Sequence, residues 1–286
     1  MLTGFVLEWI LPLTALLAIG RLLMPGSLRF LQEHGIAERN YTGDSIPTAG
    51  GLLIWLLLLA SFVIDNFTGI WNPDAVWVLS LSIICFAGFL DDVKGDKRTK
   101  GIRGHWLAWK RERSITTGIL KAAAAGLAGL LVLLPDQDSL WDLPRQLLLV
   151  LLATNGVNLF DVRPGRALKM FFFFMGMIGW SSFLMATDAA PGGAQLWHDL
   201  APVLVGALLL APLDLKGRIM LGDTGANLLG FALGIGIVRL TPELFQGAAL
   251  AVFVALHMLT WRRSLSSLIE TNRFLRWLDG AGRERV

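Results

Sequence analysis

The feature that most constrains this 286-residue chain is a series of nine apolar segments, each close to the length of a helix that crosses a bilayer. A membrane helix needs roughly 20 mainly apolar residues. With only 16% charged residues, against about 25% in soluble domains, the chain has too little polar surface for a soluble fold. We therefore expect an all-α polytopic membrane protein. Its nine spans are predicted at residues 2–24, 49–66, 76–90, 115–134, 144–160, 168–187, 200–213, 224–240 and 245–261.

Lysine and arginine are distributed unevenly between the loops, and this predicts the orientation. Four alternate loops, 67–75, 135–143, 188–199 and 241–244, contain neither residue. Of the 25 basic residues, 21 fall in the remaining segments, which are 25–48, 91–114, 161–169, 214–223 and the tail from residue 262. Because cytoplasmic loops are enriched in Lys and Arg, we expect an outer N-terminus, a cytoplasmic C-terminus and a multi-pass location in the plasma (inner) membrane.

The last segment, 263–286, reads as a cytoplasmic tail that follows a transmembrane domain of residues 1–262. Ser267 and Glu270 have the spacing of a capping box, and Gly280 is suited to end a helix. The pattern predicts an amphipathic helix on the inner membrane surface, with Arg273 and Arg276 between its apolar positions. Those apolar positions are Leu265, Leu268, Ile269, Leu275 and Leu278.

The third span ends in two adjacent carboxylates, Asp91 and Asp92, within Gly88-Phe-Leu-Asp-Asp. Neighbouring carboxylates repel each other, and a cation or a shared proton relieves that repulsion. Oxygen ligands of this kind suit Mg²⁺, which usually binds one or two carboxylates together with substrate phosphates. The alternative is a polar helix end that pairs with the basic loop after it.

A second polar group closes the fifth span. Asn155, Asn158 and Asp161 are spaced by three residues and therefore share one helical face. Arg163, Arg166 and Lys169 continue the same spacing, and such cations hold phosphate. The alternative is that the asparagines join neighbouring membrane helices.

A third group, Gly222-Asp223-Thr224-Gly225, opens the eighth span. Asp223 is placed as an N-cap, and Gly222 and Gly225 would let a ligand approach the backbone. A carboxylate here would alternatively hold the metal that carries a phosphate. Taken together, the three groups on one predicted membrane face indicate a metal–diphosphate site. No P-loop is present, the four histidines at 34, 105, 198 and 257 are scattered, and nothing points to a nucleic-acid partner.

These motifs resemble those of the polyprenyl-phosphate N-acetylhexosamine-1-phosphate transferase family. The matching segments follow one another along most of the chain: Ile46-Pro-Thr-Ala-Gly-Gly51, Phe89-Leu-Asp-Asp92, Asn155-x-x-Asn158-Leu-x-Asp161 and Leu221-Gly-Asp-Thr-Gly225. The resemblance implies a Mg²⁺-dependent exchange, with Mn²⁺ as the alternative metal. A nucleotide-sugar donor, UDP-linked, and a polyprenyl phosphate would give a polyprenyl-diphospho-sugar and UMP for cell-envelope glycan synthesis. A homodimer remains open.

The resemblance also implies roles for individual residues. Asp223 would be a metal ligand, and Asp91 and Asp92 would position or deprotonate the lipid phosphate, with Asp91 also assisting the metal. Asn158 and Asp161 would hold the nucleotide side. Lys121, two turns inside the fourth span, would pair with phosphate or with the aspartates, unless it simply reaches back to the membrane surface.

Three departures from the family pattern affect substrate choice. Pro164 stands where the family often has a second aspartate that contacts the base. The family's His-rich, sugar-selecting loop is absent, leaving only His257 inside a span. Better-known members also have ten or eleven spans. Two alternatives therefore remain: a transferase that uses another nucleotide donor, and a non-catalytic carrier that binds polyprenyl diphosphate, with Arg163 and Arg166 as its main contacts.

Overall fold

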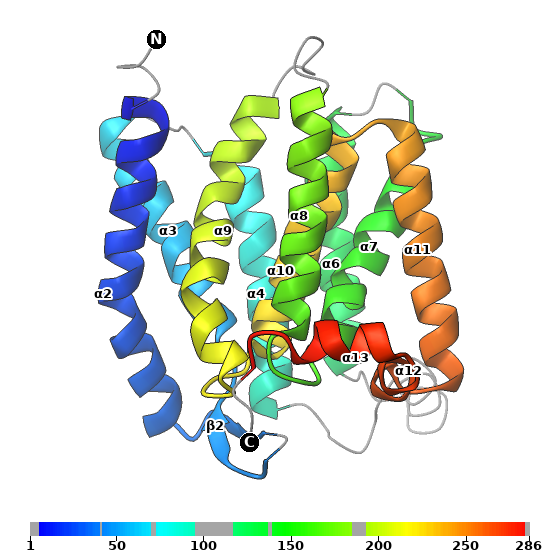
Figure 1. Ribbon diagram of the computed structural model, residues 1–286. Coiled ribbons are helices and arrows are strands. Elements are labelled where there is room, and N and C mark those ends of the chain that lie inside the picture. The colour runs from blue at the N-terminus through cyan, green and yellow to red at the C-terminus, as the bar shows by residue number, and fades with distance from the viewer. Residues whose placement is uncertain are drawn as a thin grey trace.

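Nine long helices run side by side in the described part of the chain, and the shorter elements gather mostly at their lower ends (Figure 1). The computed structural model describes residues 6–40, 42–69, 73–94, 117–136, 139–184 and 193–283. The long helices are α2 (Leu11–Glu33), α3 (Gly51–Thr68), α4 (Ala75–Lys94), α6 (Thr117–Leu133), α7 (Leu143–Phe160), α8 (Arg166–Leu184), α9 (Gly193–Leu215), α10 (Gly222–Leu240) and α11 (Glu243–Arg262). The shorter elements are the π-helical turn η1 (Val6–Ile10), the 3-10 turn η2 (Leu134–Asp136), strands β1 (Ala37–Arg39) and β2 (Ser45–Pro47), and helices α12 (Leu265–Thr271) and α13 (Arg273–Gly280).

Each of the nine predicted spans coincides with one long helix, which confirms the all-α polytopic class. Within the described residues, seven helices are long and apolar enough to cross a membrane; α6, at 17 residues, is shorter, and α10 is not among the seven. The predicted orientation stays a prediction, and residues 95–116, which contain most of the basic loop on which it relies, lie outside the described ranges.

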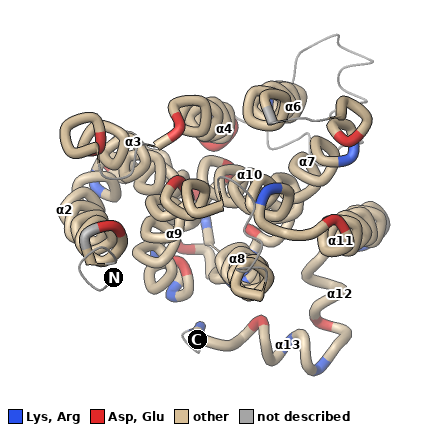
Figure 2. Tube along the Cα trace, turned by 90° about the horizontal axis from the view of Figure 1, so that it is seen from above, with Lys and Arg blue, Asp and Glu red and all other residues tan. Residues whose placement is uncertain are grey.

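Helix α10 occupies the middle of the bundle, with α4, α7, α8 and α9 around it (Figure 2). Nearly all of its residues are buried, so little of its surface is left to face lipid. Two glycines set its distance from α7. A Cβ at Gly230 would lie 2.6 Å from Thr154 Cα, and one at Gly234 would lie 2.8 Å from Val150 Cα. Small residues allow this backbone approach, which is a common basis for helix association in membranes.

Two local features differ from the sequence prediction at the lower end. Helix α2 continues to Glu33, nine residues beyond the predicted end of the first span, and passes through Pro25. Burial of Leu31, which is 1% exposed, favours this extension even though a proline inside a helix removes a hydrogen bond. After it, β1 and β2 form an antiparallel hairpin in which Glu38 pairs with Ile46. The sequence analysis did not predict this hairpin.

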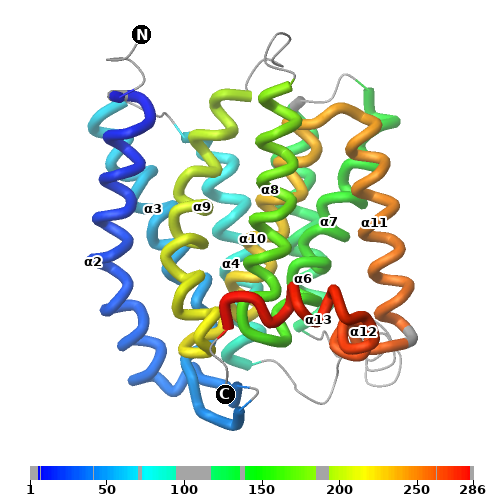
Figure 3. The backbone as a smooth tube through the Cα atoms, viewed as in Figure 1, coloured from blue at the N-terminus to red at the C-terminus, as the bar shows by residue number. Residues whose placement is uncertain are grey.

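The tail consists of two short helices, where a single amphipathic helix was predicted. Asn272 separates them, because its side-chain Oδ1 accepts hydrogen bonds from the amides of Phe274 and Leu275 at 2.9 and 3.1 Å and so starts α13. The predicted capping box at Ser267 and Glu270 is wrong: Ser264 caps α12 and accepts a hydrogen bond from the Ser267 amide. Gly280 does end α13, as predicted. The tail turns back from α11 and crosses in front of the lower end of α8 (Figure 3).

Candidate functional site

Two carboxylates and one ammonium group, from three different helices, meet at the lower end of the bundle. Lys121 Nζ on α6 donates a hydrogen bond to Asp91 Oδ2 on α4 at 2.7 Å, and also to Asp223 Oδ2 on α10. The side chains of Lys121, Asp91 and Asp223 are 21%, 19% and 20% exposed. The structure thus brings together three predicted site residues, largely screened from water but within reach of a ligand.

Asp92, the second carboxylate of the pair on α4, faces the start of α10. Its Oδ1 accepts a hydrogen bond from the Asp223 amide at 2.8 Å, and its Oδ2 accepts from the Thr224 amide at 2.9 Å and from Thr224 Oγ1 at 2.5 Å. A carboxylate in this position satisfies amides that the helix leaves unpaired and balances the positive end of its dipole.

The prediction that Asp223 is the N-cap of this helix is therefore wrong. The N-cap residue is Leu221, which has helical backbone angles and makes no side-chain capping bond. The carboxylate of Asp92 supplies the missing acceptors from another helix. As a result, Asp223 lies in the first turn of α10, and its side chain is turned toward Lys121.

We call the contact between Asp92 of α4 and the start of α10 the Asp92–Asp223 junction. Glycines on both sides of it permit the close packing. Gly222 has a φ of +67°, and a Cβ there would lie 2.5 Å from Asp92 Oδ2. A Cβ at Gly88 would lie 2.5 Å from the Asp223 carbonyl oxygen, and one at Gly51 would overlap Gly225. Gly222 and Gly225, which were predicted to admit a ligand, here admit the neighbouring helices α4 and α3. Their contact with a ligand stays a prediction.

The two asparagines of the predicted polar face on α7, Asn155 and Asn158, have different surroundings. Asn155 Nδ2 lies 2.8 Å from Nε2 of His257 on α11, while His257 Nδ1 lies 2.7 Å from the Phe253 carbonyl oxygen. Because a carbonyl only accepts, Nδ1 carries the proton, and Nε2 accepts from Asn155. Asn155 thus joins α7 to α11, which is the alternative that the sequence left open. Asn158, one turn further on, is partly buried.

Asp161 follows directly after α7, at its C-cap. Burial raises the pKa of Asp161 well above its ordinary value, and the negative charges of Asp214, Asp92 and Asp223 raise it further. A backbone hydrogen bond from Gly222 acts in the opposite direction. Asp161 is therefore linked electrostatically to the carboxylates on α4 and α10.

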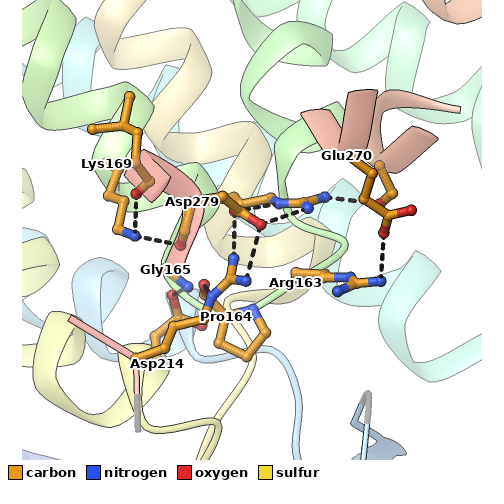
Figure 4. A network of polar contacts seen from close by, with 11 residues as sticks. Arg163, Pro164, Gly165, Lys169, Asp214, Glu270 and Asp279 are labelled. Carbon is orange, nitrogen blue, oxygen red and sulfur yellow. Dashed lines mark hydrogen bonds and ion pairs between the residues drawn. The ribbon is translucent and has the colours of Figure 1, made fainter. Parts of the chain in front are cut away.

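The three cations predicted to hold phosphate all contact the C-terminal tail in this structure (Figure 4). Arg163 pairs with Glu270 at 3.1 Å. Arg166 is 3% exposed and pairs with Asp279, and Lys169 Nζ donates to the carbonyl oxygens of the tail. The structure does not bring Arg166 to the Lys121 cluster, by which we mean Lys121, Asp91 and Asp223. Phosphate binding by these residues stays a prediction.

A small cavity of about 50 Å³ lies beside Asp161, and it includes residues that the sequence analysis did not select. It is enclosed by the β1–β2 hairpin, the α7–α8 turn and the α9–α10 loop, and Asn40 in the hairpin donates to the Gly217 carbonyl oxygen at 3.3 Å. Asp214, which is buried at the end of α9, also lines it. A carboxylate that closes an apolar span was the signal that identified Asp91, and the same signal would have identified Asp214.

A larger apolar cavity of about 600 Å³ lies between α2, α3 and α4. Its lining on α4 includes Cys85, Phe86 and Phe89. Successive helix residues are about 100° apart, so Phe89 and Asp91 point to nearly opposite sides of α4. This cavity therefore does not open onto the Lys121 cluster by way of α4.

Comparison with known proteins identifies relatives of this chain. No protein-family model matches the chain. It is 30% identical to the phospho-N-acetylmuramoyl-pentapeptide-transferase of Heliobacterium modesticaldum over 256 residues, which cover 84% of this chain and 76% of that protein. Proteins of the same name from Maridesulfovibrio salexigens and Chlamydia pneumoniae are 29% and 27% identical, over 85% and 73% of this chain and 74% and 64% of theirs. Sequence identity, coverage and a polytopic helical fold lead to one conclusion: the chain is a divergent member of the phospho-N-acetylmuramoyl-pentapeptide-transferase family.

Proposed function

We propose that this protein transfers a sugar-1-phosphate from a nucleotide-diphosphate sugar, UDP-linked, to a polyprenyl phosphate at the cytoplasmic membrane face. The products are a polyprenyl-diphospho-sugar and UMP, and the reaction serves cell-envelope glycan synthesis. Family membership supports a phosphotransferase that works on a membrane lipid. The donor, the metal and the orientation are part of the proposal.

The observation that carries the proposal is the convergence of Asp91 and Asp223 on Lys121. Three helices from separate parts of the sequence place two carboxylates around one positive charge, at a partly accessible point near the helix ends. Charges at the ends of membrane helices cost free energy, and such clusters usually mark functional sites. Such a cluster suits phosphoryl transfer, which depends mainly on positioning and on stabilising negative charge: Lys121 would supply positive charge, and the carboxylates would hold a metal or orient the attacking phosphate.

The proposed exchange needs no other reactant. A phosphate oxygen of the lipid attacks the phosphorus that carries the sugar, and a new P–O–P bridge forms. The bond from that phosphorus to the bridging oxygen of the donor breaks, and the oxygen leaves with UMP. In this step Lys121 donates to a phosphate oxygen, and Asp91 orients or deprotonates the attacking lipid phosphate. Asp161 and Asn158 hold the nucleotide side.

A divalent metal fits the residues present. No group of three or more His, Cys, Asp or Glu in the described ranges is arranged to hold a metal. Mg²⁺, however, usually binds only one or two carboxylates and takes its remaining oxygens from substrate phosphates and water. Asp91 and Asp223 already share one cation, the Lys121 ammonium, so they would hold Mg²⁺, with Mn²⁺ as the alternative. When bound, the metal would neutralise charge on the diphosphate.

Asp92 has a different part in the proposal. Both of its oxygens accept hydrogen bonds from the first turn of α10, which carries Asp223. We therefore assign it a positioning role: it holds the backbone of Asp223 so that the Asp223 carboxylate faces α6. This narrows the choice between Asp91 and Asp92 as the base in favour of Asp91.

The test is nucleotide release by the purified protein. With Mg²⁺ and undecaprenyl phosphate, we expect UMP to be released from at least one member of a panel of UDP-sugars. Asp223→Asn should abolish that release, while Asp142→Asn, at the N-terminal end of α7 and therefore at the opposite end of that helix from Asp161, should not change it. Absence of nucleotide release with every donor and metal would refute the proposal. Release from CDP- or other donors alone would refute the UDP assignment, and tight binding of polyprenyl diphosphate without turnover would indicate a carrier.

A further inference from the structure

One carboxylate of the C-terminal tail, Asp279 on α13, pairs with Arg166, the residue at which the α7–α8 turn ends. Arg166 donates to it from Nε at 2.6 Å and from Nη2 at 2.8 Å, and a second arginine, Arg283, donates from Nη2 at 2.6 Å and from Nη1 at 3.0 Å. Lys169 adds hydrogen bonds to the carbonyl oxygens of Leu278 and Asp279 at 3.0 and 2.7 Å. We call Arg166, Lys169, Asp279 and Arg283 the Asp279 cluster.

The cluster is too well enclosed to be an ordinary surface ion pair. The side chains of Arg166, Asp279 and Arg283 are 3%, 11% and 14% exposed. Arg166 also donates from Nη1 to Ser266 Oγ at 2.8 Å, so each of its three nitrogens is engaged by the tail. Burial alone would raise the pKa of Asp279, but hydrogen bonds and positive charge from the two arginines lower it below its ordinary value. Bidentate pairs of this kind fix orientation as well as contributing energy.

The same residues restrain the turn that leads out of the candidate site. Arg283 Nε donates to the Pro164 carbonyl oxygen at 2.7 Å. The next residue, Gly165, has a φ of +77°, and its amide donates to Asp214 Oδ2 at 2.8 Å. Figure 4 shows the tail carboxylate on one side of this turn and Asp214 on the other. The turn is therefore held from two sides, only three residues after Asp161.

We propose that the tail is a positioning part of the site: Asp279, through Arg166 and Arg283, holds the α7–α8 turn so that Asp161 faces the Asp92–Asp223 junction. The kinetic consequence rests on the proposed function, in which Asp161 serves the nucleotide side. Loss of the cluster should then weaken use of the nucleotide donor and leave use of the lipid phosphate unchanged. A merely structural tail would affect both substrates alike.

Two measurements on the full-length protein in lipid nanodiscs test this. The first is hydrogen–deuterium exchange in peptides from 161–169 and 273–283. The second is the KM for the UDP-sugar and for undecaprenyl phosphate. Asp279→Asn should lower protection in both peptides by about tenfold and raise the donor KM by about tenfold, with kcat and the lipid KM changed less than about threefold. Arg283→Lys, which keeps the Arg166–Asp279 pair, should give a smaller change in the same direction and serves if the first variant does not fold.

Glu270→Gln is the matched control, because it removes another acidic partner of the same turn from the same tail. Its pair with Arg163 is 40% and 56% exposed, and exposed pairs contribute little. Wild-type exchange and kinetics are expected. Faster exchange in 273–283 with unchanged exchange in 161–169 would overturn the proposal, as would equal rises in both KM values. If the wild type releases no nucleotide, the proposed function fails, and the exchange of 161–169 still decides whether the tail holds the turn.

Discussion

Gly230 in the centre of α10 offers a sharp test of how this bundle is assembled. In Gly230→Ala, the new methyl carbon would lie 2.6 Å from Thr154 Cα and 2.7 Å from the Ala153 and Thr154 carbonyl oxygens of α7. All three are backbone atoms, so no side chain can rotate away. Ordinary contact begins at 3.4 Å, and α7 must therefore move by about 0.8 Å relative to α10.

The magnitude follows from two opposing effects. Alanine favours a helix over glycine by about 0.5–1 kcal/mol. Overpacking a well-packed interior costs about 1–3 kcal/mol. We expect Gly230→Ala to lose about 1–2 kcal/mol, which at roughly 2–4 °C per kcal/mol lowers the melting temperature by roughly 2–8 °C. The shift also separates α7, which leads to Asp161, from α10, which carries Asp223, so nucleotide release should fall as well.

Thermal unfolding of the purified protein, followed by intrinsic tryptophan fluorescence, measures the effect. Gly126→Ala in α6 is the matched control, because it lies inside a helix of the same bundle and its new Cβ would meet nothing within 4 Å. It should keep or slightly raise the melting temperature. If Gly230→Ala is as stable as Gly126→Ala, the close α7–α10 packing described above is not what sets the position of α10.

Three further outcomes are expected. Asp92→Asn replaces one carboxylate oxygen with an amide NH2 group, which cannot accept the hydrogen bonds of the Thr224 amide and hydroxyl. Each unsatisfied buried group costs about 1–3 kcal/mol, so thermal unfolding should occur at a lower temperature. Lys121→Met removes the cation that Asp91 and Asp223 share; nucleotide release should fall, while Mg²⁺ should raise the melting temperature at a concentration at least about tenfold lower than in the wild type. Because folding lowers the pKa of Asp279, its contribution to stability is present above the ordinary pKa of about 3.9 and is lost as the pH falls below that value. Amide hydrogen exchange of the tail, corrected for intrinsic rates, should therefore be constant between pH 7 and 5.

The sequence predicted the positions of the helices well, because a membrane restricts the choices. Each apolar run has to be a helix, and its length is set by the bilayer. The first span was predicted to end at residue 24, nine residues too early. The buried Leu31 lies beyond that point, and the packing that favours the longer helix is not visible in a one-dimensional pattern.

The acidic site residues were identified by one rule: a charged side chain at the end of an apolar segment costs free energy and usually marks a functional site. The rule selected Asp91 and Asp223, the family resemblance added Lys121, and the structure brings the three into contact. It did not distinguish Asp223 from an N-cap, since local sequence gives no information about a carboxylate that arrives from another helix. Arg166 illustrates the same limit, because its partner Asp279 is more than a hundred residues away.

What decides the partner of each carboxylate here is backbone proximity. Asp91 and Asp92 are adjacent, yet one is neutralised by an ammonium group and the other by the amides of a helix end. The second arrangement requires α10 to start against α4, which Gly88 and Gly222 permit. A Cβ at Gly88 would lie 2.5 Å from the Asp223 carbonyl oxygen, and one at Gly222 would lie 2.5 Å from Asp92 Oδ2. With Asp92 balanced in this way, Asp91 and Asp223 are left to share the single positive charge of Lys121. Under the proposed function, the same two carboxylates would also hold the metal that accompanies an arriving diphosphate.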